Sequence, residues 1–287
     1  MKAIDILHEI SGRLAPCGID GAEREAGLFI TEGLDIDPVR LYRDNPGIRE
    51  EQAVALREMA DRRSRREPLQ YILGRIDFAG LEISVGPGVL IPRPETELMA
   101  EHAARALLRR RASDNRQRTM ILDLCTGSGC LALALARAFP DARVLGVDIS
   151  ETALGYAREN ARLNGTGNVE FLRGHLFEPL RGGRLFDLVV SNPPYIKTGD
   201  INGLQPEVRD WEPLVALDGG EDGLDFYREI IPAARRFLRH RGVLMLELGA
   251  EAAEAVAGMF RRSGYTRIEI FKDYAGIKRV IQAEWTR

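Results

Sequence analysis

A regular alternation of strand-like and helix-like segments after about residue 118 constrains the fold of this chain more than any other feature. Continuous apolar runs predict strands at 119–124, 143–148, 168–172, 186–191 and 243–248, and near Ile268 and Val280. Between these runs, apolar residues with a period of three to four predict helices at 129–138, 151–163, 226–238 and 251–262. Such alternation is typical of a mostly parallel sheet with helices on both faces. We therefore predict an α/β protein with a doubly wound sheet.

The first 75 residues lack this alternation. Apolar residues such as Ile6, Ile10 and Leu14 recur every three or four positions, which predicts a small bundle of helices. From residue 78 to residue 90 the apolar period changes to two, as in a short β-hairpin. The sequence therefore predicts three parts: a helical domain over 1–75, a β-hairpin linker over 76–93 and the α/β domain over 94–287.

The helical part contains one dense basic run, Arg62–Arg66. Arginines in the last turn of a helix interact favourably with the helix dipole while their charged ends stay in water. We interpret the run as a solvated helix end. A contact with phosphate or with an acidic partner is the alternative.

Charge and composition exclude several classes of protein. The chain has 45% hydrophobic and 29% charged residues, which is ordinary for a globular protein. Its 40 Lys and Arg residues against 43 Asp and Glu residues give a net charge of −3, whereas a protein that coats a phosphate backbone is normally basic. We therefore expect no direct binding of nucleic acid.

The cysteines and the N-terminus bear on the compartment. Cys17, Cys125 and Cys130 cannot all pair and show no CxxC spacing, which fits a reducing compartment and argues against a structural metal site. Asp5 and Glu9 interrupt the stretch that a signal peptide keeps apolar. We expect a cytoplasmic protein with no membrane partner.

The loop Asp123–Gly129 lies between the first strand and the first helix of the predicted α/β domain. Its glycines let backbone N–H groups and a helix N-terminus approach a ligand closely. Asp148 ends the next strand, 21 residues after Gly127, where a carboxylate can accept both hydroxyls of a ribose. The pattern indicates a cofactor that contains adenosine. It leaves NAD open, because Gly127, Gly129 and Ala132 also satisfy the looser dinucleotide fingerprint.

The tetrapeptide Asn192-Pro193-Pro194-Tyr195 directly follows the predicted strand at 186–191. Ligands of open α/β sheets bind outside the carboxyl ends of the strands. Prolines have a fixed φ and no N–H, so they present carbonyls in a preset direction. The Asn192 side-chain oxygen and the Pro193 carbonyl would then form two acceptors facing one way, beside the flat wall of Tyr195. This predicts a planar substrate group that ends in NH₂.

A nitrogen of this kind is a poor nucleophile, because its lone pair is delocalised into the neighbouring carbonyl or ring. In an amide the rotation barrier that reflects this delocalisation is about 18–20 kcal/mol. Two acceptors raise the electron density on nitrogen and hold it in line with an electrophile. No strong base is required at the start, since the proton can leave after a methyl group arrives. We expect positioning and electrostatics to carry the catalysis.

Together with the glycine loop and Asp148, this tetrapeptide resembles class I S-adenosylmethionine-dependent amino methyltransferases. More narrowly, the chain resembles the release-factor glutamine methyltransferases, often called PrmC or HemK. The stretches that carry the narrower resemblance are Pro68–Gly74, Val89–Glu97, Ser191–Ile196, Glu212–Pro213 and Gly219–Leu224. The resemblance is thin only over about the first sixty residues, and it implies a Rossmann-like methyltransferase sheet.

The resemblance implies a specific reaction: transfer of a methyl group from S-adenosyl-L-methionine to the N5 amide nitrogen of the glutamine in the Gly-Gly-Gln motif of class-1 peptide chain release factors. S-adenosyl-L-homocysteine would be the second product. Asn192, Pro193 and Tyr195 would be catalytic and, with Pro194, would bind the substrate amide. The residues implied in cofactor binding are Cys125, Thr126, Gly127, Ser128, Gly129, Asp148, His175 and Asn192. The helical domain would be a docking platform for the protein substrate.

Two positions depart from the pattern of the family. Cys125 stands where many class I methyltransferases have the first glycine of the loop, and a backbone with φ > 0 would be strained there. His175 stands where the family often has Asp, the usual partner of the adenine amino group. A neutral imidazole nitrogen can also accept that hydrogen bond. A loop histidine without a ligand role is the alternative.

The connection Lys197–Asp222 is long for a compact domain and follows the Asn192–Tyr195 turn. Long loops of this kind are usually functional or mobile, so we hypothesise a substrate-side flap that orders on binding. Three other functions compete with release-factor methylation. They are methylation of an adenine or cytosine amino group in nucleic acid, a catalytically silent cofactor-binding protein, and an NAD-dependent oxidoreductase, for which no hydride-site acid or base stands out.

Overall fold

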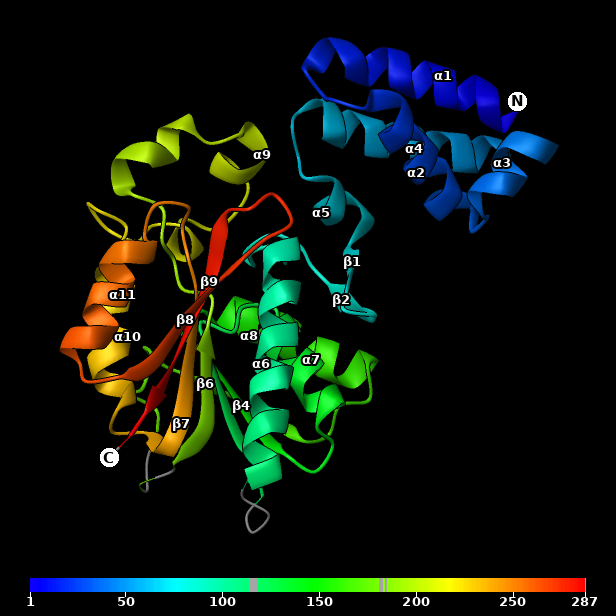
Figure 1. The fold of residues 1–287 in the computed structure, drawn as a ribbon. Helices are drawn as coiled ribbons and strands as arrows, with labels where there is room; N and C mark the ends of the chain where they lie inside the picture. Colours follow the sequence, from blue (N-terminus) through cyan, green and yellow to red (C-terminus); the bar gives the residue numbers. More distant parts are fainter. Residues whose placement is uncertain (114–117, 181–182, 184, 287) are drawn as a thin grey trace. The chain divides into compact units, whose positions relative to one another are not determined.

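The computed structural model describes residues 1–286 apart from 114–117, 181, 182 and 184. The chain forms two compact units, each described here by itself (Figure 1). One unit comprises Met1–Arg75 together with Gln205–Trp211, and the other comprises Ile76–Leu204 and Glu212–Arg287. The sequence placed Gln205–Trp211 in the α/β part, whereas the structure groups this segment with the helical unit.

The helical unit confirms the predicted bundle. Its helices are α1 (Ala3–Leu14), α2 (Ala22–Leu34), α3 (Pro38–Asp44), α4 (Glu50–Ser64), α5 (Leu69–Leu73) and the short α9 (Pro206–Arg209). The apolar face of α1 buries Ile6, Leu7 and Ile10 in a core that also contains Phe29 of α2 and Leu56 of α4.

The basic run Arg62–Arg66 differs from the solvated helix end that the sequence predicted. Arg62 and Arg65 are exposed, but Arg63 is only 6% exposed. Its Nε lies 2.6 Å from Glu25 Oε2 and its Nη1 lies 2.8 Å from Glu207 Oε1. Arg66 Nη2 lies 2.7 Å from Glu207 Oε2. The interpretation is therefore wrong for Arg63, whose acidic partners belong to the same unit and hold α9 on it.

The second unit contains a seven-stranded sheet in the order β5-β4-β3-β6-β7-β9-β8. The strands are β3 (Met120–Leu124), β4 (Arg143–Asp148), β5 (Val169–Arg173), β6 (Phe186–Ser191), β7 (Leu238–Glu247), β8 (Thr266–Lys272) and β9 (Lys278–Trp285). Strands β3 to β7 pair in parallel, and β9 pairs antiparallel with both β7 and β8. A separate two-stranded sheet consists of β1 (Arg75–Phe78) and β2 (Leu81–Ser84), as the hairpin pattern predicted.

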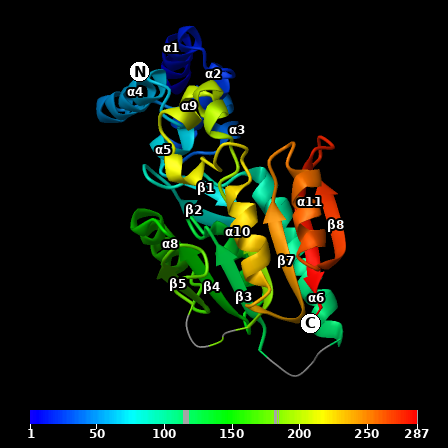
Figure 2. The same cartoon turned by 90° about the vertical axis from the view of Figure 1, so that its left-hand side faces the viewer.

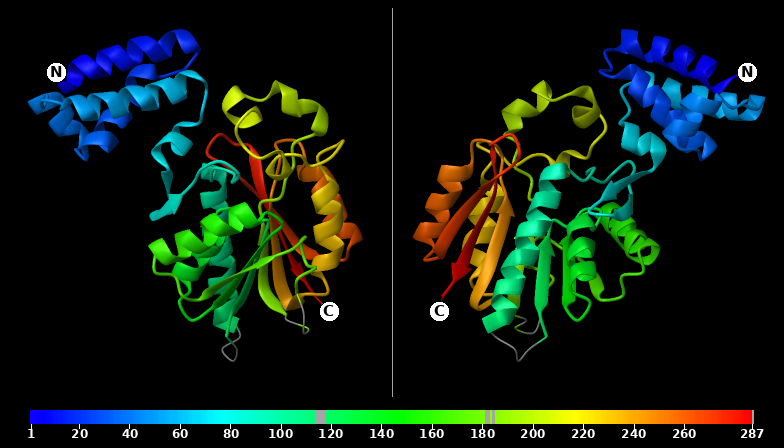
Figure 3. Two further views of the ribbon diagram at one scale, coloured as in Figure 1. Left: turned by 180° about the vertical axis from the view of Figure 1, so that it is seen from behind. Right: turned by 45° about the vertical axis from the view of Figure 1, so that its right-hand side comes forward.

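Helices cover both faces of the large sheet (Figures 2 and 3). They are α6 (Pro94–Ser113), α7 (Cys130–Ala138) and α8 (Glu151–Leu163) on one face, and α10 (Asp225–Ala234) and α11 (Ala253–Arg262) on the other. The doubly wound Rossmann-like fold class is thereby confirmed. Ser150 caps α8 as predicted, since its Oγ accepts from the N–H of Ala153 at 3.2 Å. Helix α10 ends earlier than the predicted Leu238, because Leu238 already pairs with Phe186 in the sheet.

The order of the strands positions the ligand site. From β3 the chain proceeds outward to β4 and β5, then returns to β6 on the other side of β3, which makes the β3–β6 boundary a topological switch point. Leu124 pairs with both Val147 and Ser191, so the loops after β3, β4 and β6 leave the sheet at one edge. The Ser191 hydroxyl donates to the carbonyl of Leu124 at 2.8 Å and ties two of these ends together. None of the helices in the described part of the chain combines the length and the apolar character that a membrane span requires.

Candidate active site

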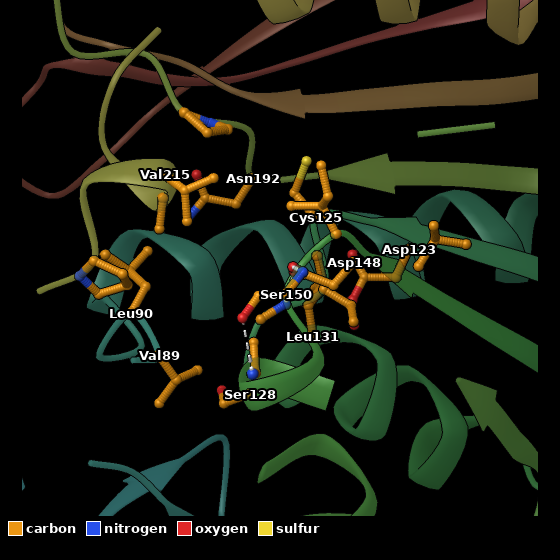
Figure 4. A pocket seen from close by; sticks show the side chains of 18 of the residues that line it. Val89, Leu90, Asp123, Cys125, Ser128, Leu131, Asp148, Ser150, Asn192 and Val215 are labelled. Atoms are coloured by element: carbon orange, nitrogen blue, oxygen red, sulfur yellow. Dashed lines mark hydrogen bonds between the residues drawn. The ribbon is translucent and has the colours of Figure 1, made fainter. Parts of the chain in front are cut away.

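A pocket lies at the carboxyl ends of β3, β4 and β6, within the α/β unit (Figure 4). Of the residues implicated by the sequence, it is lined by Cys125, Thr126, Gly127, Ser128, Asp148, His175, Asn192 and Pro194. Gly129, Pro193 and Tyr195 are not among its lining residues. Further walls come from Gly88–Leu90, Ile149–Ser150, Pro213, Val215 and Ala216, to which the sequence assigned no role in binding the cofactor. The structure thus brings the two predicted motifs to one cavity.

The loop after β3 follows a left-handed course at three alternate positions. Cys125 has φ 57°, Gly127 has φ 55° and Gly129 has φ 79°. The N–H of Thr126 donates to the carbonyl of Val147, which fixes the start of the loop against β4. Cys125 therefore occupies the strained conformation that the sequence anticipated for a missing glycine, at a cost of about 1–2 kcal/mol.

The carboxylate of Asp148 organises this loop. Its Oδ2 accepts from the N–H of Gly127 at 2.8 Å, and its Oδ1 accepts from the N–H of Ser150 at 2.9 Å. Burial raises the pKa of Asp148, although these backbone donors act in the opposite direction. A carboxylate has about four acceptor positions, and the N–H groups of Gly127, Ser150 and Ile149 donate to this one, so acceptor capacity remains for a ligand in the pocket.

Asp123 also lines the pocket, and the sequence did not assign it a role. It is 1% exposed, and its Oδ2 accepts from the Thr126 hydroxyl at 2.6 Å. Burial raises the pKa of Asp123 to about 7. A carboxylate inside the otherwise apolar strand Met120–Leu124 was the available signal for a special role.

Burial lowers the thiol reactivity expected of two of the three cysteines, Cys125 and Cys130, both of which line the pocket. Burial raises the pKa of Cys130 to about 12 and raises that of Cys125 further. Because the thiolate is the reactive form, we expect iodoacetamide at pH 8 to modify Cys17 first, with Cys125 and Cys130 reacting only after unfolding in urea. Mass spectrometry of the labelled chain measures this order. Rapid labelling of a Cys17→Ser variant under native conditions would contradict it.

The side-chain amide of Asn192 is hydrogen-bonded through its nitrogen, Nδ2. Its Nδ2 donates to Thr96 Oγ1 at 3.2 Å, and Thr96 Oγ1 donates to Glu247 Oε2 at 2.7 Å. The amide oxygen of Asn192 is consequently the end that faces away from Thr96. Asn192 lines the pocket, in the group of side chains that Figure 4 shows with Val215. This orientation leaves the Asn192 oxygen available as an acceptor, and its contact with a substrate amide stays a prediction.

Tyr195 is fixed by its hydroxyl and by its backbone. The hydroxyl donates to Glu247 Oε1 at 3.4 Å, and burial raises the pKa of the phenol. A Cβ atom on Gly219 would lie 2.7 Å from Tyr195 Cα, and one on Gly223 would lie 2.5 Å from the Tyr195 carbonyl oxygen. A Cβ atom on Gly249 would lie 3.2 Å from Tyr195 Cδ2. The glycines are required because other chain segments pack directly on this turn.

His175 lines the pocket and is oriented from α10. Its Nε2 lies 2.9 Å from Glu229 Oε2, and its ring centroid lies 6.3 Å from that of Phe226, another lining residue. Contact of the imidazole with an adenine amino group stays a prediction.

An ion pair connects the start of α6 with the chain that follows Trp211. Arg93 Nη2 lies 2.7 Å from Glu212 Oε2. Burial raises the pKa of the Glu212 carboxyl, and the nearby Arg93 acts against that rise. Glu212 directly precedes Pro213, which lines the pocket, so this pair anchors one wall of the cavity.

Comparison with known proteins agrees with this arrangement. Residues 5–74 match the family model of the PrmC N-terminal domain, and residues 99–204 match that of the methyltransferase small domain. The chain is 45% identical over 281 residues to the release factor glutamine methyltransferase of Thermodesulfovibrio yellowstonii, covering 98% of this chain and 97% of that protein. It is 46% identical over 278 residues to the enzyme of the same name from Geobacter sulfurreducens, covering 96% of this chain and 94% of that protein.

The fold is also found among solved structures. A methyltransferase from Pyrococcus furiosus superposes with a TM-score of 0.52 at 20% identity, covering 72% of this chain and 90% of that one. A 16S rRNA N2 G1207 methyltransferase from T. thermophilus superposes with a TM-score of 0.52 at 22% identity, covering 74% of this chain and 50% of that one. These two likenesses concern the fold alone, whereas the relatives at 45% and 46% identity span nearly the whole chain. The chain belongs to the release factor glutamine methyltransferase family.

Proposed function

We propose that this protein transfers a methyl group from S-adenosylmethionine to the side-chain amide nitrogen of the glutamine in the Gly-Gly-Gln motif of class-1 peptide chain release factors. The observation that carries the proposal is the orientation of Asn192, whose amide nitrogen is bound by Thr96 so that its oxygen is presented as an acceptor. The names of the relatives that match nearly the whole length of the chain support the choice of substrate.

The chemistry of the lining residues fits the proposed cofactor. Asp148 offers acceptors for ribose hydroxyls, and the loop Cys125–Gly129 offers a backbone turn at the start of α7. Apolar side chains suited to a flat adenine ring come from Leu131, Ile149 and Phe226. When bound, S-adenosylmethionine supplies an electrophilic methyl group. We propose that Cys125, Thr126, Gly127, Ser128, Gly129, Asp148, His175 and Asn192 hold it.

The proposed catalysis is positional. The side-chain oxygen of Asn192 and the carbonyl of Pro193 accept the two N–H bonds of the substrate amide, and Tyr195 packs against its plane. Accepting both hydrogens raises the electron density on nitrogen and aligns its lone pair for attack. The amide proton leaves to solvent after the new C–N bond forms, so none of the three residues has to act as a strong base.

We propose that the helical domain over 1–75 docks the protein substrate, with the hairpin at 76–93 joining it to the catalytic domain at 94–287. Apolar exposure supports this role: Val39 is 65% exposed, Tyr42 57% and Val54 44%. Exposed apolar side chains are typical of surfaces that meet another protein. The segment Lys197–Asp222 contains η2 (Thr198–Gly203), α9 and η3 (Leu214–Ala216), and its ordering by substrate remains a proposal.

Asp148→Asn tests the cofactor site. We expect the affinity for S-adenosylmethionine to fall roughly 10-fold to 100-fold, because hydrogen bonds to a charged group contribute about 1.5–3 kcal/mol and the amide nitrogen cannot accept. Isothermal titration calorimetry measures the change. The control is Asp141→Asn, which alters an exposed carboxylate outside the pocket. Equal affinities of the two variants would contradict the assignment of Asp148.

A transfer assay tests the choice of substrate. The protein is incubated with methyl-labelled S-adenosylmethionine and, in parallel, with an unmethylated class-1 release factor, duplex DNA or ribosomal RNA. We expect label only in the release factor. Label in DNA or RNA with none in the release factor would replace the proposal by nucleic-acid amino methylation.

A further inference from the structure

Glu247 is a buried carboxylate behind the proposed site. It ends β7, is 1% exposed, and is not among the residues that line the pocket. Its two oxygens connect to two residues of the Asn192–Tyr195 turn, to Asn192 through Thr96 and to Tyr195 directly. Glu247 Oε2 accepts a hydrogen bond from the Thr96 hydroxyl, and Thr96 Oγ1 accepts one from Asn192 Nδ2. Glu247 Oε1 accepts a hydrogen bond from the Tyr195 hydroxyl.

The direction of this chain of hydrogen bonds follows from a count of protons. Thr96 has a single O–H. When that proton is donated to Glu247, the Thr96 oxygen is left as an acceptor, and only the NH₂ end of Asn192 can satisfy it. The Asn192 oxygen must then face the pocket.

Protonation of Glu247 reverses the direction of both hydrogen bonds. Glu247 Oε2 lies 2.7 Å from Thr96 Oγ1, whereas Oε1 lies 3.4 Å from the Tyr195 hydroxyl. A proton on Oε2 therefore forms the shorter hydrogen bond, so we place it there. Thr96 then accepts from Glu247, and its own proton points at Asn192. The amide of Asn192 turns its oxygen to Thr96 and its NH₂ group to the pocket, where two donors face the N–H bonds of the substrate.

We infer that Glu247 is a positioning residue that, through Thr96, sets which end of the Asn192 amide faces the substrate. The inference rests on the proposed amide methylation. It assigns Thr96 and Glu247, which lie 151 residues apart in the sequence, to the machinery of the reaction. Glu247 does not line the pocket, whereas Thr96 does, and we assign Thr96 no hydrogen bond to the substrate.

The surroundings of Glu247 leave its charge adjustable. The titratable and charged groups that face it are Glu95 on α6, Cys130 on α7, Tyr195 after β6, Tyr227 on α10 and Arg279 on β9. Burial raises the pKa of Glu247 to about 7, against the opposing effects of the Thr96 and Tyr195 hydrogen bonds. We therefore expect kcat to fall as the pH drops below about 7, when Glu247 takes up a proton.

Paired substitutions at Thr96 separate positioning from packing. Thr96→Ser keeps the hydroxyl, and Thr96→Val keeps the branched shape without it. We expect the serine variant to keep kcat within about threefold, and kcat of the valine variant to fall about tenfold or more, because the Asn192 NH₂ group loses its buried acceptor. We expect the affinity for S-adenosylmethionine, measured by calorimetry, to change little in either variant.

Glu247→Gln supplies a second readout. The glutamine oxygen can accept from Thr96 at every pH while its NH₂ group donates to Tyr195, so we expect the pH profile of kcat to lack the acid limb predicted for the wild type. Between about pH 4.5 and 7, Glu247 is protonated in the folded protein but ionised in the unfolded chain. Its contribution to the free energy of unfolding therefore falls as the pH rises through this window. Glu247→Gln removes this contribution, and its stability relative to wild type should therefore rise with pH.

The outcomes are distinct. If Thr96→Val and Thr96→Ser have equal kcat, or if the acid limb persists unchanged in Glu247→Gln, the positioning role is wrong. If the wild type methylates none of the substrates offered, the proposed function itself fails, while the pH dependence of unfolding still reports the charge of Glu247. A tenfold separation of the Thr96 pair together with loss of the acid limb supports the inference.

Discussion

Asn192→Ala should lower kcat for methyl transfer by about 10²–10³-fold, the loss typical of removing one preorganised hydrogen-bonding group from an active site. The alanine retains the fold of the turn, because the neighbouring prolines and the packing of Gly219 and Gly223 on Tyr195 are untouched. What disappears is the acceptor that Thr96 holds toward the pocket. Single-turnover transfer from labelled S-adenosylmethionine measures the effect.

The control for this variant is Asp141→Ala, which removes an exposed side chain outside the pocket. We expect that control to retain wild-type kcat. We also expect Asn192→Ala to bind S-adenosylmethionine with an affinity within about tenfold of wild type, because Asp148 and the glycine loop remain. A kcat within threefold of wild type for Asn192→Ala would show that this amide does not take part in the reaction.

Arg63→Met should destabilise the helical unit by about 3–5 kcal/mol, the cost of leaving buried charges without their partner. The side chains of Arg63 and Glu25 are 7% and 12% exposed, and that of Glu207 is 16% exposed. Without the guanidinium, Glu25 loses its ion pair in a poorly hydrated site, and Glu207 on α9 is held by Arg66 alone. Calorimetry of the full chain measures the shift in the unfolding transition of this unit.

The control lies two residues along the same run. Arg65 is exposed, and we expect Arg65→Met to change stability by less than about 0.5 kcal/mol. A triple variant, Arg63→Met with Glu25→Gln and Glu207→Gln, removes all three charges at once. It should recover much of the loss, because neutral replacement of a whole buried ion network is often tolerated. Equal effects of Arg63→Met and Arg65→Met would contradict the structural role of the network.

Local sequence patterns were sufficient to predict the fold class and to locate the glycine loop and the Asn192–Tyr195 turn. Apolar strands such as 186–191 are buried on both faces, so their composition alone marks them. The backbone conformation of Cys125 was also predictable, because it stands where many class I methyltransferases have the first glycine of the loop. Cys125 does have a positive φ. In each case the cause lies within a few residues of the effect.

Partners that are distant in the sequence escaped prediction. Arg63 meets Glu25 and Glu207, which lie 38 and 144 residues away, and only the folded unit shows that these charges are buried together. Thr96 and Glu247 are equally remote from each other. A glutamate in the apolar strand at 243–248 was a visible anomaly, but its partners could not be named without the register of the sheet.

Locating the transferred methyl group tests the proposed reaction most directly. The protein, S-adenosylmethionine and an unmethylated class-1 release factor are incubated together, and the release factor is digested and analysed by mass spectrometry. We predict a single added methyl group on the glutamine of the Gly-Gly-Gln motif, absent when Asn192→Ala replaces the wild type. A methyl group on any other residue, or none despite measurable binding of the cofactor, would contradict it.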